Sequence, residues 1–448
     1  MTSATDRYQE IYLAQKANLA TLKSTRAEKR IAKLQKLRDA VVSHADDIGN
    51  AQHADMRKMP LGIQTIEVAA ALQDIDDAIA GLQDWMQAEV YEPSPENAGN
   101  QTYVQYEPKG VVLLFGPWNF PFHLVVAPLV PIIAAGNSCI VKPNEMAPHT
   151  SAILAKLLGE VFPTNEVAVV EGGVPVANAL LELPVDHIFF TGSPNIGKVI
   201  MAAAAKHLAS VTLELGGKCP VIIDESADLK AVIGGITRAR FFNAGQLCLS
   251  TDHIWLKASQ RDAFVAGLGA AIEQAFYKDG ELNTFLMSRI VDKANFQRLK
   301  GYVDDALAKG ATIAVGGAMN EDDLTIEPMV LIDVPLDAEI MQHEIFGPIL
   351  PVLCYENPKE IQQLIHQSGK PLAMYLFSQN QSFIDDMLLN TSSGGVTVNG
   401  VMSRAGERRL PFGGANSSGI GRYKGVHGFR ELSNARAMFV HRAESYGR

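Results

Sequence analysis

The run Val111-Val112-Leu113-Leu114-Phe115, flanked by Gly110 and Gly116, gives the first indication of the fold. A short run that is apolar throughout is typical of a strand buried on both of its faces. Further runs of this kind, separated by helix-length segments, occupy residues 139–141, 167–170, 188–190 and 211–213. Buried strands that alternate with helices predict an α/β fold with a doubly wound parallel sheet of the nucleotide-binding type.

The segments on either side of this sheet also have clear patterns. Residues 27–51 and 64–90 carry apolar side chains at helical spacing, so we expect the first ninety residues to be helical. Residues 92–100 end the helices, and residues 101–106 alternate as in a half-exposed strand. A Gly-rich loop at 412–421 and a final strand at 435–440 are expected near the C-terminus. A second α/β unit is expected after Cys219, with strand candidates at 221–223, 313–315, 330–332, 350–353, 374–377 and 396–398.

Composition restricts the class of protein. The 448 residues are 47% hydrophobic and 20% charged, and the net charge of −10 argues against a nucleic-acid-binding surface. No secretory signal begins the chain, and no apolar run approaches the roughly 20 residues of a membrane helix. We therefore expect a cytoplasmic protein that contacts neither membrane nor nucleic acid. The four cysteines include no CxxC pair, so we expect neither a metal site nor a disulfide framework.

Two strand ends carry residues suited to ligand binding. In Phe190-Thr191-Gly192-Ser193-Pro194-Asn195-Ile196-Gly197, a strand leads into a helix whose free N–H groups could hold a phosphate. Gly192 would let the backbone approach a ligand, and Gly197 would let the helix pack on the strand. The pattern also fits an ordinary strand-to-helix turn, since the G-x-G-x-x-G fingerprint is absent. At another strand end, Lys142 and Glu145 could bind ribose hydroxyls or could be solvated.

Glu214 and Asn119 are candidates for catalysis. Glu214 lies between two leucines at a strand end, where apolar surroundings would raise its pKa and suit a general base. A solvated position on an edge strand is the alternative for Glu214. Asn119 lies in the turn after the 111–115 strand, where its side-chain N–H could stabilise an oxyanion. An asparagine in a turn is also often there for turn geometry alone.

Cys248 is the cysteine best placed to act as a nucleophile, because it follows a turn at Gly245. The other three are expected to be structural, since Cys139 lies in an apolar run, Cys354 in a strand candidate and Cys219 at a strand start. A lone cysteine is more often structural than catalytic, so spacing alone leaves both roles open for Cys248.

Together these segments resemble the aldehyde dehydrogenase superfamily, in the order and at the spacing of that family, over residues 25–440. Leu247 is a departure that bears on the substrate, because the family commonly has a smaller or more polar residue before its cysteine. The short N-terminus is similar to the class 3 branch, whose members act on fatty or aromatic aldehydes and are usually dimers. The matching motifs are Pro117-Trp118-Asn119-Phe120-Pro121, Phe190-Thr191-Gly192-Ser193, Glu214-Leu215-Gly216-Gly217-Lys218, Gly245-Gln246-x-Cys248, Glu344-Ile345-Phe346-Gly347-Pro348 and Pro411-Phe412-Gly413-Gly414.

The resemblance implies a role for each motif. Cys248 would attack the aldehyde, Asn119 would stabilise the oxyanion, and Glu214 would activate water to hydrolyse a thioester. The implied substrate-channel residues are Phe120, Leu247 and Phe412. The implied cofactor-binding residues are Trp118, Lys142, Glu145, Gly192, Ser193, Gly197, Leu215, Glu344 and Phe346.

The resemblance also implies three structural regions and a homodimer. Residues 1–91 and 110–216 would form a Rossmann-like NAD(P)-binding domain, and residues 217–410 an α/β catalytic domain. Residues 92–109 and 425–442 would form a small β bridging domain, which would pair the strand near Tyr103 with the tail strand near Met438.

We expect NAD to be preferred and NADP also to be used, because a carboxylate at Glu145 would bind ribose hydroxyls and repel a 2′-phosphate. Apolar side chains favour an aromatic or a medium- to long-chain aliphatic aldehyde. One alternative is a semialdehyde whose carboxylate is bound by an arginine. The other is a CoA-acylating enzyme, although such relatives typically lack the glutamate at the Glu214 position. The candidate arginines are Arg404, Arg408 and Arg409.

Overall fold

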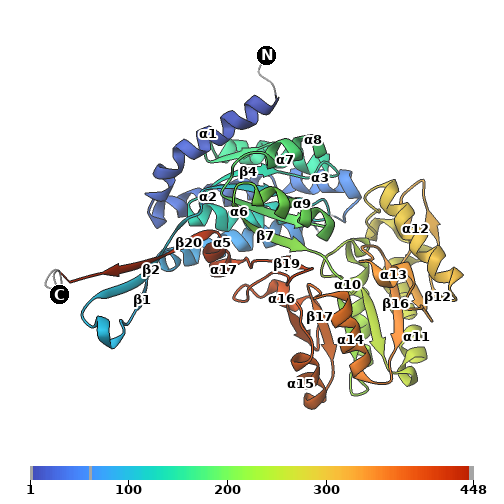
Figure 1. The fold of residues 1–448 in the computed structure, drawn as a ribbon. Coiled ribbons are helices and arrows are strands. Elements are labelled where there is room, and N and C mark those ends of the chain that lie inside the picture. Colours follow the sequence, from blue (N-terminus) through green and yellow to red (C-terminus); the bar gives the residue numbers. More distant parts are fainter. Residues whose placement is uncertain (1–3, 60–62, 443–448) are drawn as a thin grey trace.

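The computed structural model describes residues 4–59 and 63–442, and Figure 1 shows two α/β units with a narrow projecting arm. The first unit contains a six-stranded sheet in the order β19-β7-β6-β3-β4-β5. The strands from β7 to β5 run parallel, and β19 joins β7 as an antiparallel edge. The expected doubly wound sheet is therefore confirmed. Its strands are β3 (Val111–Phe115), β4 (Ser138–Lys142), β5 (Val167–Val169), β6 (His187–Gly192), β7 (Ser210–Leu215) and β19 (Gly419–Ile420).

Helices cover both faces of this sheet. Successive side chains of a strand point to opposite faces, so Val112 and Leu114 join one core cluster while Val111, Leu113 and Phe115 join another. All five side chains are buried, which explains why the run lacks polar residues. One face packs against α2 (Ala27–Ser43), α3 (Ala45–Met56), α5 (Ala69–Trp85), α6 (His123–Ala135) and α7 (Pro148–Val161), and the other against α1 (Ala4–Lys23), α8 (Val174–Leu181) and α9 (Pro194–Ala205).

The second unit contains a seven-stranded sheet in the order β12-β15-β16-β9-β8-β17-β18, in which only β12 is antiparallel. Its strands are β8 (Pro220–Ile223), β9 (His253–Leu256), β12 (Thr312–Val315), β15 (Met329–Ile332), β16 (Ile349–Cys354), β17 (Met374–Phe377) and β18 (Val396–Val398). Its helices are α10 (Leu229–Phe241), α11 (Ala258–Phe276), α12 (Lys293–Ala308), α13 (Glu339–Gln342), α14 (Pro358–Ser368), α15 (Gln381–Leu389) and α16 (Ser403–Gly406). Side-chain oxygens of the preceding residue cap four of these helices, through Asp228, Asp292, Asn357 and Asn380.

The arm is a three-stranded antiparallel sheet of β1 (Glu89–Tyr91), β2 (Gln101–Pro108) and β20 (Ser433–Val440). Tyr103 lies opposite Met438, so two segments far apart in the sequence are joined there. Figure 1 shows the arm extending away from both α/β units. The helix α17 (Gly425–Glu431) precedes β20 and packs on the core of the first unit. Within the described residues, none of the helices has the length and apolar character needed to cross a membrane.

Three details of the sequence-based expectation were wrong. The segment 64–90 is helical only as far as Trp85, because β1 begins at Glu89, and its first part is a π-helix (Ile63–Val68) that precedes α5. The strand β9 was missed, since it lacks the glycines and prolines that bound the other buried strands. The Gly-rich loop at 412–421 contains β19, which is only two residues long and exists through its pairing with β7. Pairing across the fold decides β1 and β19, and local pattern does not report it.

Candidate active site

The first sheet has a topological switch point at β3. The chain passes from β3 through β4 to β5 on one side, and then returns so that β6 lies on the other side of β3. In open α/β sheets, ligands bind at such a point, outside the carboxyl ends of the strands. A cavity of about 620 Å³ lies there, lined by the turn after β3, the end of β6 and the loop that carries Cys248. We call it the switch-point cavity.

The loop before Cys248 has an unusual backbone conformation. Asn243, Ala244 and Gly245 have φ angles of 51°, 52° and 71°, in the left-handed region that costs a non-glycine residue free energy. A side chain at Gly245 would overlap the carbonyl oxygen of Gly347. The backbones of two loops therefore meet at Gly245, and this contact explains the glycine immediately before Gln246.

Gln246 anchors this loop from the inside. It is fully buried, and its side-chain N–H groups donate to the carbonyl oxygens of Asn243 and Arg289, at 3.1 Å each. Its side-chain oxygen accepts the N–H of Val291 at 3.0 Å. Three hydrogen bonds from one buried side chain fix the approach to Cys248.

Asn119 is tied to the same loop. Its side-chain N–H donates to the carbonyl oxygen of Gln246 at 3.2 Å, and its own carbonyl oxygen accepts from the Asn243 side chain at 3.3 Å. The turn after β3 and the loop before Cys248 therefore form one hydrogen-bonded unit. Asn119 and Cys248 both line the switch-point cavity.

A buried ion pair supports the turn of Asn119 from behind. The Glu67 carboxylate accepts the backbone N–H groups of Phe122 and His123, at 3.1 and 2.9 Å, where α6 begins. Glu67 also pairs with Lys58, whose ammonium group lies 4.2 Å from the ring centre of Phe120. Because the donors at the start of a helix lack intrahelical partners, the carboxylate both caps α6 and neutralises the lysine.

Burial shifts the pKa of both Glu214 and Cys248. Neither carboxylate oxygen of Glu214 has a hydrogen-bond partner among the described residues, and burial raises its pKa well above the ordinary value, although Arg422 and Arg404 oppose this. The expectation of a raised pKa is confirmed, and the solvated alternative for Glu214 is wrong. Burial also raises the pKa of the Cys248 thiol to about 12, with Glu344 and Glu214 acting in the same direction. The raised pKa favours the neutral thiol of Cys248 over the thiolate.

The far end of the switch-point cavity is polar. Lys142 at the end of β4 pairs with Glu145, and the lysine side chain is buried while that of the glutamate is 38% exposed. The first turn of α9 lines the cavity, and the Ser193 hydroxyl accepts the N–H of Ile196 at 3.5 Å as the N-cap. A helix start of this kind favours an anionic ligand.

The loop that carries Glu344 and Phe346 closes the cavity beside Cys248. Phe346 has a φ of 52°, and its ring meets that of Trp118 edge-on at 5.3 Å. Glu344 packs so closely on Gly216 that a side chain there would overlap its carboxylate. Burial raises the pKa of Glu344 to about 8, and its Oε1 atom has no hydrogen-bond partner in the described part of the chain.

Four of the residues expected from the sequence do not line the switch-point cavity. Gly197 lies inside α9 and lets the helix pack against Leu215 of β7. Phe120 is buried between Lys58 and the ring of Phe242. The remaining two are Phe412, which is buried, and Leu247, which is half-buried against the core.

The three candidate arginines have different surroundings. Arg408 is paired with Asp77, and Arg409 is exposed. Arg404 is half-buried, lies 5.3 Å from the ring centre of Phe412 and donates to the carbonyl oxygen of Leu372 at 3.1 Å. None of the three lines the switch-point cavity. No group of side chains suited to a metal ion occurs in the part of the chain that the structure describes.

The chain is similar to known proteins along nearly its whole length. The model of the aldehyde dehydrogenase family matches residues 2–438. The chain is 42% identical over 446 residues to the putative aldehyde dehydrogenase AldX of Bacillus subtilis, covering 98% of this chain and 99% of that protein. It is 38% identical over 411 residues to the dimeric NADP-preferring aldehyde dehydrogenase of Rattus norvegicus, covering 92% and 89%. The substrate-bound structure of Staphylococcus aureus AldH superposes with a TM-score of 0.94 at 34% identity, covering 98% and 95%.

The chain therefore belongs to the aldehyde dehydrogenase family. The resemblance to the class 3 branch is confirmed, since its relatives include aldehyde dehydrogenase family 3 member A2 of Macaca fascicularis, at 39% identity over 411 residues, 92% of this chain and 84% of that protein. The protein is an NAD(P)-dependent oxidoreductase that oxidises an aldehyde to the carboxylic acid.

Proposed function

We propose that Cys248, Asn119 and Glu214 form the catalytic centre of this aldehyde dehydrogenase. The observation that carries the proposal is that these residues, from three separate segments, line one cavity at the switch point of the sheet. A nucleophile, an oxyanion donor and a base must meet in this way to act on one carbonyl group.

The residues of the switch-point cavity fit a nicotinamide dinucleotide. At one end Lys142 and Glu145 offer a donor and an acceptor to the hydroxyls of a ribose, and at the α9 start Ser193 and Gly192 offer a site for the pyrophosphate. At the other end the unpartnered Oε1 of Glu344 is suited to a second ribose. Trp118, Leu215 and Phe346 supply apolar walls. When bound, the dinucleotide supplies the hydride acceptor.

In the first half of the proposed reaction, the sulfur of Cys248 bonds to the aldehyde carbon, and the carbonyl oxygen becomes an oxyanion. The Cys248 proton leaves to water at this step, so the Glu214 carboxylate stays available for the second half. Asn119 stabilises the oxyanion with its side-chain N–H, together with the backbone N–H of Cys248. The hydride then leaves the aldehyde carbon, and a thioester on Cys248 remains.

In the second half, Glu214 removes a proton from water as the water oxygen attacks the thioester carbon. The carbon–sulfur bond breaks, the carboxylic acid departs, and the Cys248 thiolate takes the proton that Glu214 removed from water. Transfer of the acyl group to CoA would not require a base for water, so the buried carboxylate of Glu214 favours hydrolysis over the CoA-acylating alternative.

The experiment that tests the catalytic centre compares Cys248→Ala with Cys354→Ala. Cys354 is a half-buried cysteine at the end of β16 and does not line the cavity, so it is the matched control. We expect Cys248→Ala to lose turnover by a factor of at least about 1,000 while cofactor affinity is kept, and Cys354→Ala to behave as wild type. Wild-type turnover in Cys248→Ala would overturn the mechanism.

We propose that NAD is preferred and that NADP is also accepted. The support for NAD is the Glu145 carboxylate, which would repel a 2′-phosphate. The support for NADP is that Glu145 can turn toward solvent and leave Lys142 as a cation, and that the rat relative is described as NADP-preferring.

We propose an aromatic or a medium- to long-chain aliphatic aldehyde as the substrate. A further cavity of about 710 Å³ with mostly apolar walls is lined by Phe242, Val401 and Met402. Phe242 stacks on Phe120, so this cavity adjoins the turn that carries Asn119. The pairing of Arg408 with Asp77 weakens the semialdehyde alternative. Comparison of kcat/KM for benzaldehyde, hexanal and succinic semialdehyde tests this choice, and a preference for succinic semialdehyde would overturn it.

We further propose that residues 1–91 and 110–216 form the cofactor domain, residues 217–410 the catalytic domain, and residues 92–109 and 425–442 the bridging segments of a homodimer. Membership of the three sheets supports this division, although the sheet of the arm already begins at Glu89. The four free cysteines fit a reducing, cytoplasmic location.

A further inference from the structure

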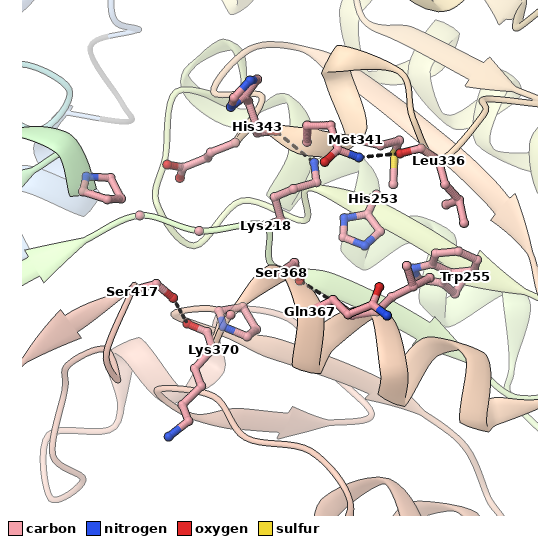
Figure 2. A pocket seen from close by; sticks show the side chains of 18 of the residues that line it. Lys218, His253, Trp255, Leu336, Met341, His343, Gln367, Ser368, Lys370 and Ser417 are labelled. Atoms are coloured by element: carbon pink, nitrogen blue, oxygen red, sulfur yellow. Dashed lines mark hydrogen bonds between the residues drawn. The ribbon is translucent and has the colours of Figure 1, made fainter. Parts of the chain in front are cut away.

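The segment that carries Glu344 is a partition between two cavities. His343 and Glu344 line the switch-point cavity and also a second cavity of about 560 Å³. Figure 2 shows Lys218, His253 and His343 around this second cavity. Ile345 packs in the hydrophobic core, but the two cavities leave the His343–Glu344 part with fewer packed neighbours, so directed bonds add to packing in fixing its position.

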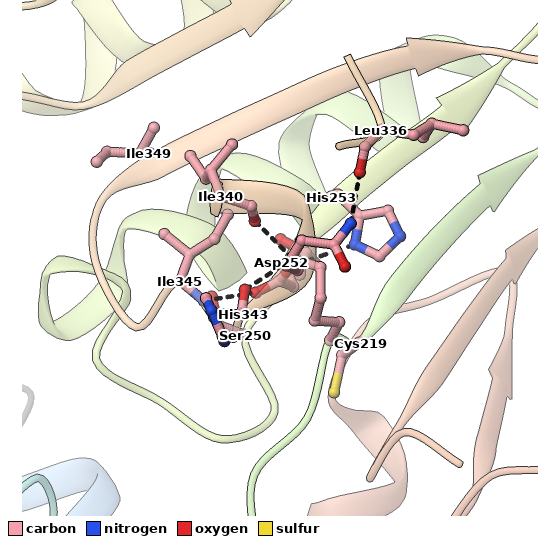
Figure 3. A network of polar contacts seen from close by, with 12 residues as sticks. Cys219, Ser250, Asp252, His253, Leu336, Ile340, His343, Ile345 and Ile349 are labelled. Atoms are coloured by element: carbon pink, nitrogen blue, oxygen red, sulfur yellow. Dashed lines mark hydrogen bonds and ion pairs between the residues drawn. The ribbon is translucent and has the colours of Figure 1, made fainter. Parts of the chain in front are cut away.

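A buried ion pair supplies these bonds at both peptide neighbours of Glu344. The ammonium group of Lys218 donates to the carbonyl oxygen of His343 at 3.0 Å. The carboxylate of Asp252 accepts the backbone N–H of Ile345 at 3.0 Å. The side chains of Lys218 and Asp252, which pair with each other, are only 10% and 3% exposed. Figure 3 shows Asp252, His343 and Ile345 in this network of polar contacts.

The same pair is connected to the loop of the nucleophile. Asp252 ends this loop, and its backbone N–H donates to the carbonyl oxygen of Cys219 at 2.9 Å. The thiol of Cys219 in turn donates to the carbonyl oxygen of Cys248 at 3.3 Å. The chain of contacts therefore runs from the backbone of Cys248 through Cys219 and Asp252 to the backbone beside Glu344.

Arg240 joins the two loops at another point. Its guanidinium group is fully buried and donates to the carbonyl oxygens of Thr251, at 3.1 Å, and Ile349. Together with the contact between Gly245 and Gly347, this gives three separate connections between the nucleophile loop and the Glu344 loop. Three connections fix both the distance and the relative orientation of two loops.

We propose that Lys218 and Asp252 are positioning residues that hold Glu344 at a fixed place relative to Cys248. The nicotinamide ribose and the thiohemiacetal, which is the adduct of Cys248 with the aldehyde, then meet in the geometry that hydride transfer requires. The inference rests on the proposed cofactor role of Glu344. A purely stabilising role is a poor explanation, because apolar side chains of similar size often stabilise a core as well as a buried ion pair does. What apolar side chains cannot supply is the directed pair of bonds to His343 and Ile345.

The test uses the double variant Lys218→Gln/Asp252→Asn, which removes both charges and leaves neither one buried alone. The matched control is Lys33→Gln/Glu166→Gln, which removes an ion pair whose side chains are 18% and 21% exposed in the first unit. Both proteins are first compared with wild type in thermal unfolding, so that only folded samples are used.

Two readouts follow the position of Glu344 directly. The first is hydrogen exchange of the Ile345 amide in the cofactor-free protein, which we expect to accelerate at least about tenfold when the carboxylate acceptor is weakened. The second is the pre-steady-state burst of reduced cofactor, which we expect to slow by about 10- to 100-fold, because small displacements of reacting groups have effects of that size. The deuterium isotope effect on the burst, measured with a 1-deuterated aldehyde, should increase because hydride transfer becomes slower.

The control should leave exchange, burst and isotope effect unchanged. A folded double variant with a wild-type burst and isotope effect would overturn the positioning role, because loss of stability alone lowers the active fraction without changing the isotope effect. The single variant Lys218→Arg should have a faster burst than the double variant, since an arginine can still donate to a carbonyl oxygen.

Glu344→Gln separates this inference from the proposed function. If Glu344→Gln leaves cofactor affinity, followed by Trp118 fluorescence, and the burst at wild-type values, the cofactor role of Glu344 is wrong, and the inference falls with it. If Glu344→Gln slows the burst, the positioning role is tested with the triple variant Lys218→Gln/Asp252→Asn/Glu344→Gln. We expect little additional loss in the triple variant, because residues that act through one another are non-additive. Full additivity would contradict the positioning role and leave the cofactor role intact.

Discussion

Burial leaves the Glu214 carboxyl group without a hydrogen-bond donor among the described residues, and its pKa is raised well above the ordinary value. A carboxyl group acts as a base only when ionised, so the active fraction of Glu214 declines as the pH falls below its raised pKa. We therefore expect the rate of thioester hydrolysis to increase with pH through that pKa. In Glu214→Gln the burst of reduced cofactor should survive while turnover becomes slow and loses this pH dependence. Equal loss of burst and turnover would show that Glu214 is not chiefly the base for hydrolysis.

The pair of Lys142 and Glu145 gives a second prediction, about cofactor choice. Glu145→Gln removes the charge that would repel a 2′-phosphate but keeps an acceptor for a ribose hydroxyl. We expect kcat/KM for NADP to improve about tenfold relative to NAD, which corresponds to about 1.4 kcal/mol. Glu182→Gln, which removes an exposed ion pair with Lys206, is a suitable control. An unchanged ratio in Glu145→Gln would mean that Glu145 does not govern the choice.

The start of helix α6 depends on a carboxylate from a distant segment. Glu67 caps the helix and neutralises the buried Lys58, so Glu67→Ala removes the cap and leaves the lysine charge unpaired. We expect a loss of about 3–5 kcal/mol in the free energy of unfolding, measured with urea. Glu166→Gln, which breaks the partly exposed pair with Lys33, should lose about 1 kcal/mol or less. Similar losses of unfolding free energy in both variants would mean that the buried Lys58–Glu67 pair stabilises the fold no more than the partly exposed Lys33–Glu166 pair does.

In the whole molecule, the arm is the feature most suited to assembly. Its strand β20 is an edge strand with mostly exposed side chains, including Phe439 at 45% exposure. An edge strand of this kind readily pairs with another chain. We expect a dimer at micromolar concentration in light scattering, and we expect Phe439→Asp to shift it toward monomer. Phe285→Asp, at an exposed aromatic residue outside the arm, should remain dimeric. A wild-type monomer would contradict the prediction.

The amino-acid sequence by itself determined those features that depend on neighbours along the chain. The run Val111–Phe115 could be identified as a doubly buried strand because burial on both faces removes every polar side chain from it. The start of α9 at Pro194 was readable because a proline fits the first helical turn. Cys248, Asn119 and Glu214 could be proposed as catalytic residues from ordered motifs, each of which is a short local pattern.

Tertiary structure decided everything that depends on residues far apart in the chain. β19 forms because it pairs with β7. Glu67 acts as a helix cap because the start of α6 lies beside it. The contacts of Lys218 with His343 and of Asp252 with Ile345 have no local signal, because a charged residue near a glycine turn looks the same whether it is solvated or buried. The physical reason is that burial and partners are set by the packing of whole elements, and no single segment contains that information.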